Sequence, residues 1–172
     1  MNLLRLLAVS AFAAVGAGLP DGSVLAQQPE RIGRFGDWTA YVSGSDENKF
    51  CYLVSSPQQA ELRDRRGGIF YMIWHRPASR EFDVVQVNIG YPFKEGSQVE
   101  LSIRDQNWKL FTDGRHAWAF NSEEDAEIVD AMRRGLRMTV RGVSSRDNAT
   151  RDVYSLSGVT AGHNAINRAC GR

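Results

Sequence analysis

The chain has 172 residues, of which 42% are hydrophobic and 24% are charged, a composition typical of one ordinary globular domain. Lys and Arg total 21 against 20 for Asp and Glu, which gives a formal net charge of +1. Such a balance creates no bulk field that would attract nucleic acid or an anionic membrane, and it therefore excludes nucleic acid as an expected partner.

The N-terminus has the three-part pattern of a secretory signal peptide. Arg5 precedes a mostly apolar stretch over 6–19, and Val24-Leu25-Ala26 supplies a cleavage site, with Val15-Gly16-Ala17 as a shorter alternative. A membrane anchor is the competing interpretation, but the stretch is shorter than the roughly 20 residues that a bilayer span needs. We expect residues 1–26 to be a signal peptide. The mature chain is then exported to the periplasm or the outer membrane, or secreted, without a transmembrane span.

Two cysteines, Cys51 and Cys170, are present and lie 119 positions apart. In an oxidising compartment an even number of cysteines first predicts a disulfide. A bridge across so long a loop stabilises a fold by roughly 4 to 5 kcal/mol in the chain-entropy model. A reactive cysteine or a metal pair is the alternative, but neither cysteine has a histidine at ligand spacing.

Residues 27–34 are polar, and we expect a flexible lead-in there and a single domain over 35–172. From residue 35 the chain alternates apolar and polar side chains in short segments separated by turn formers, a pattern typical of half-buried strands. The predicted strands cover 38–42, 50–55, 69–75, 82–89, 99–103, 108–112, 117–120, 136–140 and 153–156. The four tryptophans are interpreted as core and edge packing.

Two helices are predicted late in the chain. Ser122 starts the first as an N-cap, Ile128 and Met132 share its apolar face, and Gly135 ends it. The second covers 160–170. Because strand follows strand without intervening helices, the fold class is mainly β. We predict an antiparallel β-sandwich or a partly closed barrel, with one helix near residues 122–134 and a short C-terminal helix.

No catalytic, cofactor-binding or metal site is evident in the sequence. His75, His116 and His163 are far apart and lie on different predicted elements, so their spacing predicts no metal site. His75 stands at a strand end before Arg76 and Pro77, which is the usual place of a structural polar residue. No nucleophile elbow or phosphate-binding glycine pattern accompanies it.

A basic cluster of Arg63, Arg65 and Arg66 falls in a predicted loop over 57–68. Loops on a rigid scaffold commonly carry recognition, so this loop and a second over 144–151 are the candidate interaction surfaces. An acidic protein, a lipid head group or a polysaccharide would suit the arginines. A solvated charged loop is the alternative.

The order of local sequences resembles the invasion-associated locus B (IalB) family of bacterial exported proteins. The match covers nearly all of the mature chain. It is carried by Phe-Gly-Asp-Trp-Thr at 35–39, Phe-Cys-Tyr-Leu at 50–53, the 71–77 segment ending in His-Arg-Pro, Val-Val at 84–85, Gly-Tyr-Pro-Phe at 90–93, Leu-Phe-Thr at 110–112, Ala-Trp-Ala at 117–119, Ala-Met-Arg-Arg-Gly at 131–135, Val-Arg-Gly-Val-Ser-Ser at 140–145, Tyr-Ser-Leu-Ser-Gly at 154–158 and Ala-Cys-Gly at 169–171.

This resemblance implies an exported, β-rich, envelope-associated domain, linked in some pathogenic members to entry into host cells, with no catalytic residues to carry over. We therefore predict a non-enzymatic protein without cofactors that binds another protein or an envelope or host surface component. The alternative function is a hydrolase or small-ligand carrier that uses His75 or His116 in a barrel mouth, and it requires His75 to lie beside a carboxylate.

Overall fold

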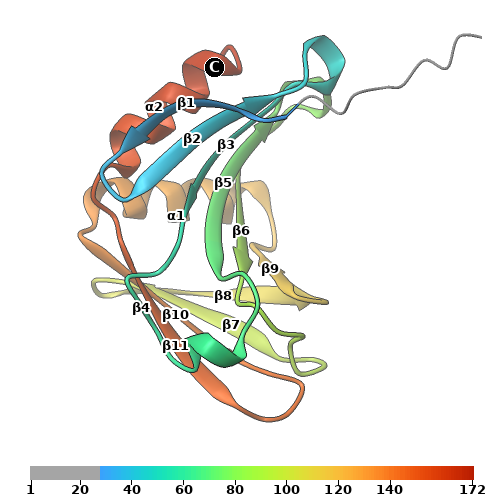
Figure 1. The fold of residues 1–172 in the computed structure, drawn as a ribbon, viewed down its shortest axis with the longest axis vertical. Helices are drawn as coiled ribbons and strands as arrows, with labels where there is room; N and C mark the ends of the chain where they lie inside the picture. The colour runs from blue at the N-terminus through green and yellow to red at the C-terminus, as the bar shows by residue number, and fades with distance from the viewer. Residues whose placement is uncertain (1–27) are drawn as a thin grey trace, which may run out of the picture.

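The computed structural model describes residues 28–172, so the expected signal peptide and its cleavage site lie outside the described residues. Eleven strands form one curled antiparallel sheet (Figure 1). The strands are β1 (Glu30–Phe35), β2 (Trp38–Ser43), β3 (Phe50–Ser55), β4 (Gln59–Ala60), β5 (Phe70–Arg76), β6 (Glu81–Asn88), β7 (Gln98–Ile103), β8 (Gln106–Asp113), β9 (His116–Trp118), β10 (Arg137–Val143) and β11 (Ala149–Ser155). Their order across the sheet is β1-β2-β3-β5-β6-β9-β8-β7-β10-β11-β4.

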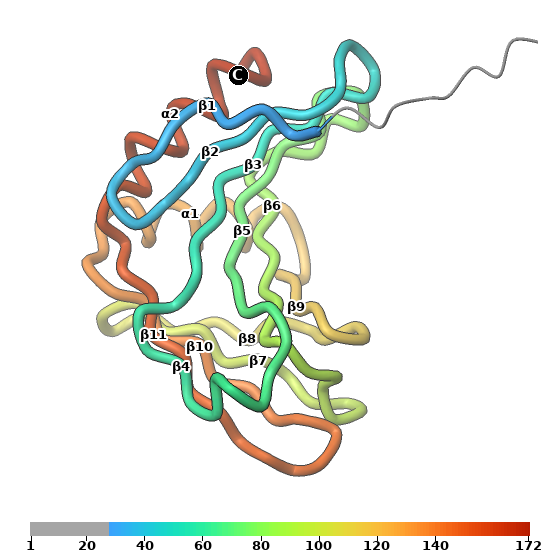
Figure 2. The backbone as a smooth tube through the Cα atoms, viewed as in Figure 1, coloured from blue at the N-terminus to red at the C-terminus, as the bar shows by residue number. Residues whose placement is uncertain are grey.

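The sheet bends where the short strand β9 joins its two halves (Figure 2). β9 pairs with β6 only over residues 86–88, and with β8 over 111–113. The end strands β1 and β4 each have one neighbour, so the curl stays open. Of the two architectures expected from the sequence, the chain therefore forms the partly closed barrel.

Both predicted helices are present. α1 (Ser122–Arg134) contacts β6, and α2 (Val159–Ala169) packs against β1, β2 and β3. The N-cap of α1 is one residue earlier than expected. The Asn121 side chain accepts the N–H of Glu124 at 2.9 Å, and the Glu124 carboxylate accepts the N–H of Phe120 at 2.8 Å. Asparagine is as good an N-cap residue as serine, and Asn121 and Ser122 are adjacent in the sequence.

The core fills the inside of the curl, where alternate residues of the central strands meet the apolar faces of the two helices. Trp38, Leu53 and Ile73 are fully buried there. The disulfide between Cys51 in β3 and Cys170 at the end of α2 is formed, with a Cα–Cα distance of 6.1 Å. It fastens the last helix to the sheet, as expected from the sequence.

The flexible lead-in expected over 27–34 is wrong for residues 30–34, which belong to β1. β1 pairs with β2 in antiparallel register from Glu30↔Val42 to Phe35↔Trp38. Because it is an edge strand whose side chains are mostly exposed, it has no apolar alternation to detect. Within 28–172 neither helix has the length and the apolar character that a membrane crossing requires.

Candidate functional site

The two loops predicted to carry recognition meet in space. The connection from β3 to β5 and the hairpin loop between β10 and β11 together line a pocket of about 550 Å³. We call it the basic loop pocket. It is lined by Leu62, Arg65, Arg66, Gly67, Gly90, Tyr91, Pro92, Arg115, Ser144, Ser145, Arg146, Asn148 and Thr150. Four of these side chains are arginines and none is a carboxylate, so the lining of the pocket is positively charged.

Arg66 is the structural member of this set. Its guanidinium donates to both carboxylate oxygens of Asp152, at 2.7 and 2.6 Å, and to the carbonyl oxygens of Ile89 at 2.7 Å and Glu61 at 2.9 Å. The side chains of Arg66 and Asp152 are 2% and 1% exposed. The guanidinium also lies 5.1 Å from the ring centre of Tyr91. Its donors are thus committed to the protein, and Arg66 anchors the loop.

The other two arginines of the predicted cluster differ from each other. Arg63 donates to the carbonyl oxygen of Pro57 at 2.6 Å and does not line the pocket. Arg65 is exposed and lines it. Two further lining arginines, Arg115 and Arg146, come from the β8–β9 turn and the β10–β11 loop. Within 28–172, no ion pair involves Arg65, Arg115 or Arg146.

The polar lining of the pocket is held by hydrogen bonds within the protein. The Ser144 hydroxyl accepts the N–H groups of Arg146 at 3.3 Å and Asn148 at 3.1 Å, which fixes the start of the hairpin loop. The Tyr91 and Thr150 hydroxyls lie 2.6 Å apart, in hydrogen-bond contact. Burial raises the pKa of the Tyr91 hydroxyl. The pocket therefore combines fixed hydroxyl groups with three unpaired cations.

A second group of polar side chains is buried beside the disulfide. His75 of β5, fully buried, lies with its Nε2 3.9 Å from Oδ1 of Asp83, and His163 of α2 lies with its Nε2 2.6 Å from the same oxygen. Arg172 pairs with the other carboxylate oxygen of Asp83. The three histidines are far apart in the sequence, but the fold brings His75 and His163 close together. The ligand atoms of His75, Asp83 and His163 lie within 4.8 Å of one another, which is metal-ligand spacing.

The hydrogen bonds of His75 oppose metal binding there. Its Nδ1 accepts the backbone N–H of Asp83 at 3.0 Å, so Nε2 carries the proton of the neutral ring and donates to Oδ1 of Asn167 at 2.7 Å. Coordination through Nε2 would require the other tautomer, which would turn an Nδ1 proton against the Asp83 N–H. Arg172 already supplies a cation to the carboxylate. This group is therefore best described as a buried hydrogen-bond network.

The geometry of Asp83 supports that description. Its backbone is left-handed, with φ of 59°, at an irregularity in the β5–β6 register. This conformation, unfavourable for a residue with a side chain, directs its N–H to His75. Burial lowers the pKa of His75. Burial would raise the pKa of Asp83, but the His163 hydrogen bond and the charges of His163 and Arg172 outweigh it, and the pKa is lowered.

The alternative of a hydrolase required His75 beside a carboxylate, and that condition is met. However, the group of His75, Asp83 and His163 does not include a nucleophile. Among the described residues the side-chain hydrogen bonds of His75 and His163 involve Asn167 and Asp83, with no hydroxyl or thiol group. His116 is in hydrogen-bond contact with the Asn88 amide at 3.3 Å, in another part of the sheet. The histidines therefore do not form a catalytic triad.

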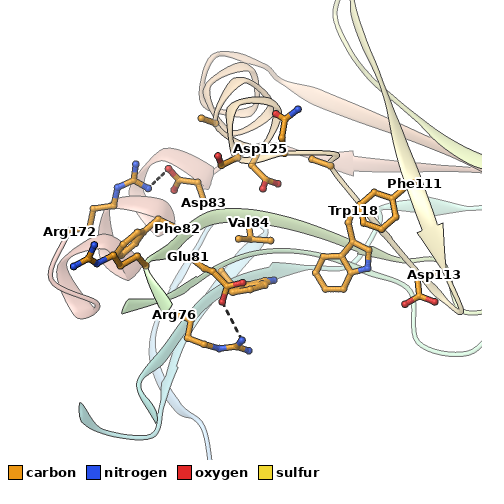
Figure 3. Close-up of a pocket in the computed structure, with 16 residues that line it drawn as sticks. Arg76, Glu81, Phe82, Asp83, Val84, Phe111, Asp113, Trp118, Asp125 and Arg172 are labelled. Carbon is orange, nitrogen blue, oxygen red and sulfur yellow. Dashed lines mark hydrogen bonds and ion pairs between the residues drawn. The ribbon is translucent and has the colours of Figure 1, made fainter. Parts of the chain in front are cut away.

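A third feature is a cleft of about 840 Å³ where β6, β9 and the first turn of α1 meet (Figure 3). We call it the aromatic cleft, because Trp74, Phe82, Phe111 and Trp118 line it together with charged side chains. Asp125 of α1 also lines it, and its Oδ1 accepts the Val85 N–H at 2.8 Å. Burial, with the charges of Asp83 and Glu124, raises the pKa of Asp125 to about 6.

A family model identifies the family of the chain, and a solved structure shows a similar fold. The model of the family described as "Invasion associated locus B (IalB) protein" matches residues 38–167. The crystal structure of invasion associated protein B from Bartonella henselae superposes with a TM-score of 0.55 at 14% identity, covering 84% of this chain and 99% of that one. No curated protein matches the sequence. The match to the family model over most of the domain places the chain in the invasion associated locus B (IalB) family.

Proposed function

We propose that the chain is an exported, envelope-associated, non-enzymatic protein that binds an anionic segment of another protein or of a surface polymer in the basic loop pocket. The observation that supports this proposal most is the lining of the pocket. Arg65, Arg115 and Arg146 converge from three separate connections without a carboxylate among the lining residues.

Arginine suits this task because its planar guanidinium binds phosphate, sulfate or carboxylate oxygens through two parallel hydrogen bonds. Arg66 and Asp152 neutralise each other and hold the loop in place, so the unpaired arginines are presented on a fixed support. The signal-peptide pattern and the disulfide support export, because disulfides persist in oxidising compartments.

The test compares two triple variants with the same change in net charge. In the first, Arg65, Arg115 and Arg146 are replaced by alanine, and in the second Arg133, Arg134 and Arg137, which lie on α1 and at the start of β10, are replaced. Binding of a sulfated oligosaccharide and of a polyglutamate peptide is measured by calorimetry at two salt concentrations. We expect the first variant to lose at least about tenfold in affinity for the better probe, and the second to bind nearly as the parent does.

Equal loss in both variants would reduce the interaction to a general effect of charge and would overturn the pocket proposal. No binding of either probe by the parent protein would overturn it as well. Tighter binding of the sulfated oligosaccharide would indicate a surface polymer as the ligand, and tighter binding of the polyglutamate peptide would indicate an acidic protein. Arg66 is left unchanged in both variants, because its replacement would disturb the fold.

A further inference from the structure

The aromatic cleft lies where the two halves of the sheet separate. β6 has eight residues, but β9 pairs only with its last three, 86–88, so residues 81–85 have no strand partner on that side. The first turn of α1 occupies part of the gap. The cleft shares no lining residue with the basic loop pocket and is independent of the function proposed above.

An exposed strand edge commonly binds an extended peptide as an added strand. On this free edge the Val85 N–H, which an added strand would need, is already accepted by the Asp125 carboxylate. The Asp83 N–H is directed to His75 of the neighbouring strand β5. The left-handed backbone of Asp83 also interrupts the regular edge. The cleft is therefore closed to strand addition, and its recognition must come from side chains.

The aromatic side chains of the cleft belong to a row of rings that continues out of the cleft over the sheet face opposite the helices. Tyr41 and Tyr52 are stacked at 5.1 Å, Phe50 lies 5.5 Å from Tyr52 and 5.4 Å from Trp74, and Trp74 meets Trp118 edge to face at 6.5 Å. Phe111 lies directly across from Trp118 in the β8–β9 pair and is 38% exposed. The row crosses β2, β3, β5, β9 and β8.

Two ion pairs line the cleft, and Arg80, Asp113 and Asp125 line it without an ion pair among the described residues. Arg76 lies 3.3 Å from Glu81 and 5.1 Å from the ring centre of Trp74, and Arg172 pairs with Asp83 (Figure 3). With three arginines and four carboxylates, the lining has no large net charge that would favour a strongly charged ligand. The indole N–H of Trp74, a residue only 7% exposed, has no hydrogen-bond partner among the described residues. The cleft thus offers flat apolar rings with balanced polar groups beside them.

We propose that the aromatic cleft binds a neutral oligosaccharide. A pyranose ring has an apolar face of C–H groups that stacks on an aromatic ring and a polar edge of hydroxyl groups that pairs with carboxylates and guanidinium groups. Trp118 and Phe111 supply the stacking surface, and Asp113, Asn121 and Asp125 line the polar side. The extended row of rings fits a chain of several sugars laid across the strands.

The experiment titrates the full mature protein with the hexasaccharide of β-1,4-linked N-acetylglucosamine and with cellohexaose, followed by calorimetry. Three variants are compared with the parent: Trp118→Ala, Phe111→Ala and Trp118→Phe. We expect each alanine variant to bind at least about tenfold more weakly, and Trp118→Phe to stay within about threefold of the parent, because it keeps an aromatic face. Phe111 is partly exposed, so its replacement tests the site without depending on the core.

The triple variant of Arg65, Arg115 and Arg146 serves as the control, and we expect it to bind the hexasaccharide as the parent does. Failure of the anion test therefore leaves this test intact. The proposal is overturned if neither hexasaccharide binds at millimolar concentration, or if one binds with an affinity that both alanine variants leave unchanged. Preferential binding of an extended uncharged decapeptide over both sugars would also overturn it.

Discussion

Arg66 and Asp152 are 86 positions apart and form a buried, two-pronged ion pair that joins the β3–β5 connection to β11. The pair holds the first of the two loops expected to act in recognition against β11, the strand that follows the second. The arginines of the predicted cluster therefore have different roles: Arg66 maintains the loop, and Arg65 remains available to a ligand.

Replacement of Arg66 by alanine should therefore destabilise the fold by about 3 to 5 kcal/mol, because it leaves Asp152 buried without its partner. Arg65→Ala is the matched control, and an exposed site of this kind should change the free energy of unfolding by no more than about 0.5 kcal/mol. Urea denaturation of both variants measures the difference. Equal stability of the two would show that the Arg66 pair is not a structural support. A simultaneous replacement of Arg63, Arg65 and Arg66 would therefore lower stability through Arg66 and would be a poor test of binding.

The disulfide should contribute about 2 to 5 kcal/mol to the free energy of unfolding, because it closes a loop of 119 positions. The measurement compares the thermal midpoint of the parent with that of the Cys51→Ser, Cys170→Ser double variant. The same double variant in reducing agent is the control and should show no further decrease. A midpoint unaffected by the loss of both cysteines would contradict the expectation.

Asp125 should make stability depend on pH. Its pKa is about 6 in the folded protein, against about 3.9 in an unfolded chain. The folded state therefore holds more protons between pH 4 and pH 6, and the contribution of this group to stability falls by about 3 kcal/mol in total as the pH rises from below 4 to above 6. Asp125→Asn keeps an acceptor for the Val85 N–H without a titrating proton. In urea titrations, the free energy of unfolding of the variant minus that of the parent should increase from pH 4 to pH 7. Parallel curves for the two proteins would refute this assignment.

Zinc should leave the thermal midpoint unchanged, even though His75, Asp83 and His163 stand at ligand spacing. The Asp83 N–H fixes the tautomer of His75, and Arg172 pairs with the carboxylate. The experiment adds zinc in tenfold excess to protein previously treated with a chelator, with His163→Ala as the comparison. An increase in the midpoint that is absent from the His163→Ala variant would mean that the network rearranges into a metal site.

Much of the fold was predictable because it depends on local pattern. The apolar face of α1, the strands of the central sheet and the disulfide were all expected, and all are present. β1 was missed because an edge strand with exposed side chains has the composition of a loop. Asn121 was missed as the N-cap because its neighbour Ser122 is an equally good candidate.

The sites were less predictable because they depend on contacts between distant segments. The pairing of His163 with Asp83 spans 80 positions, and the bulge that turns the Asp83 N–H toward His75 leaves no mark in the sequence. Arg146 lies in the second loop expected to act in recognition, but nothing in the sequence placed it beside Arg65, and the turn that carries Arg115 was not singled out at all. The tryptophans were expected to serve packing alone, and the row of rings emerged only from the strand register.

The bridge from Cys51 to Cys170 makes a covalent ring of most of the folded domain. Both loops of the basic loop pocket lie inside that ring. A protease that cut the backbone in either loop would therefore produce two pieces that remain bonded through sulfur, with the strands on each side of the cut still hydrogen-bonded to their neighbours. The surface proposed to meet partners outside the cell could thus be nicked without release of a fragment.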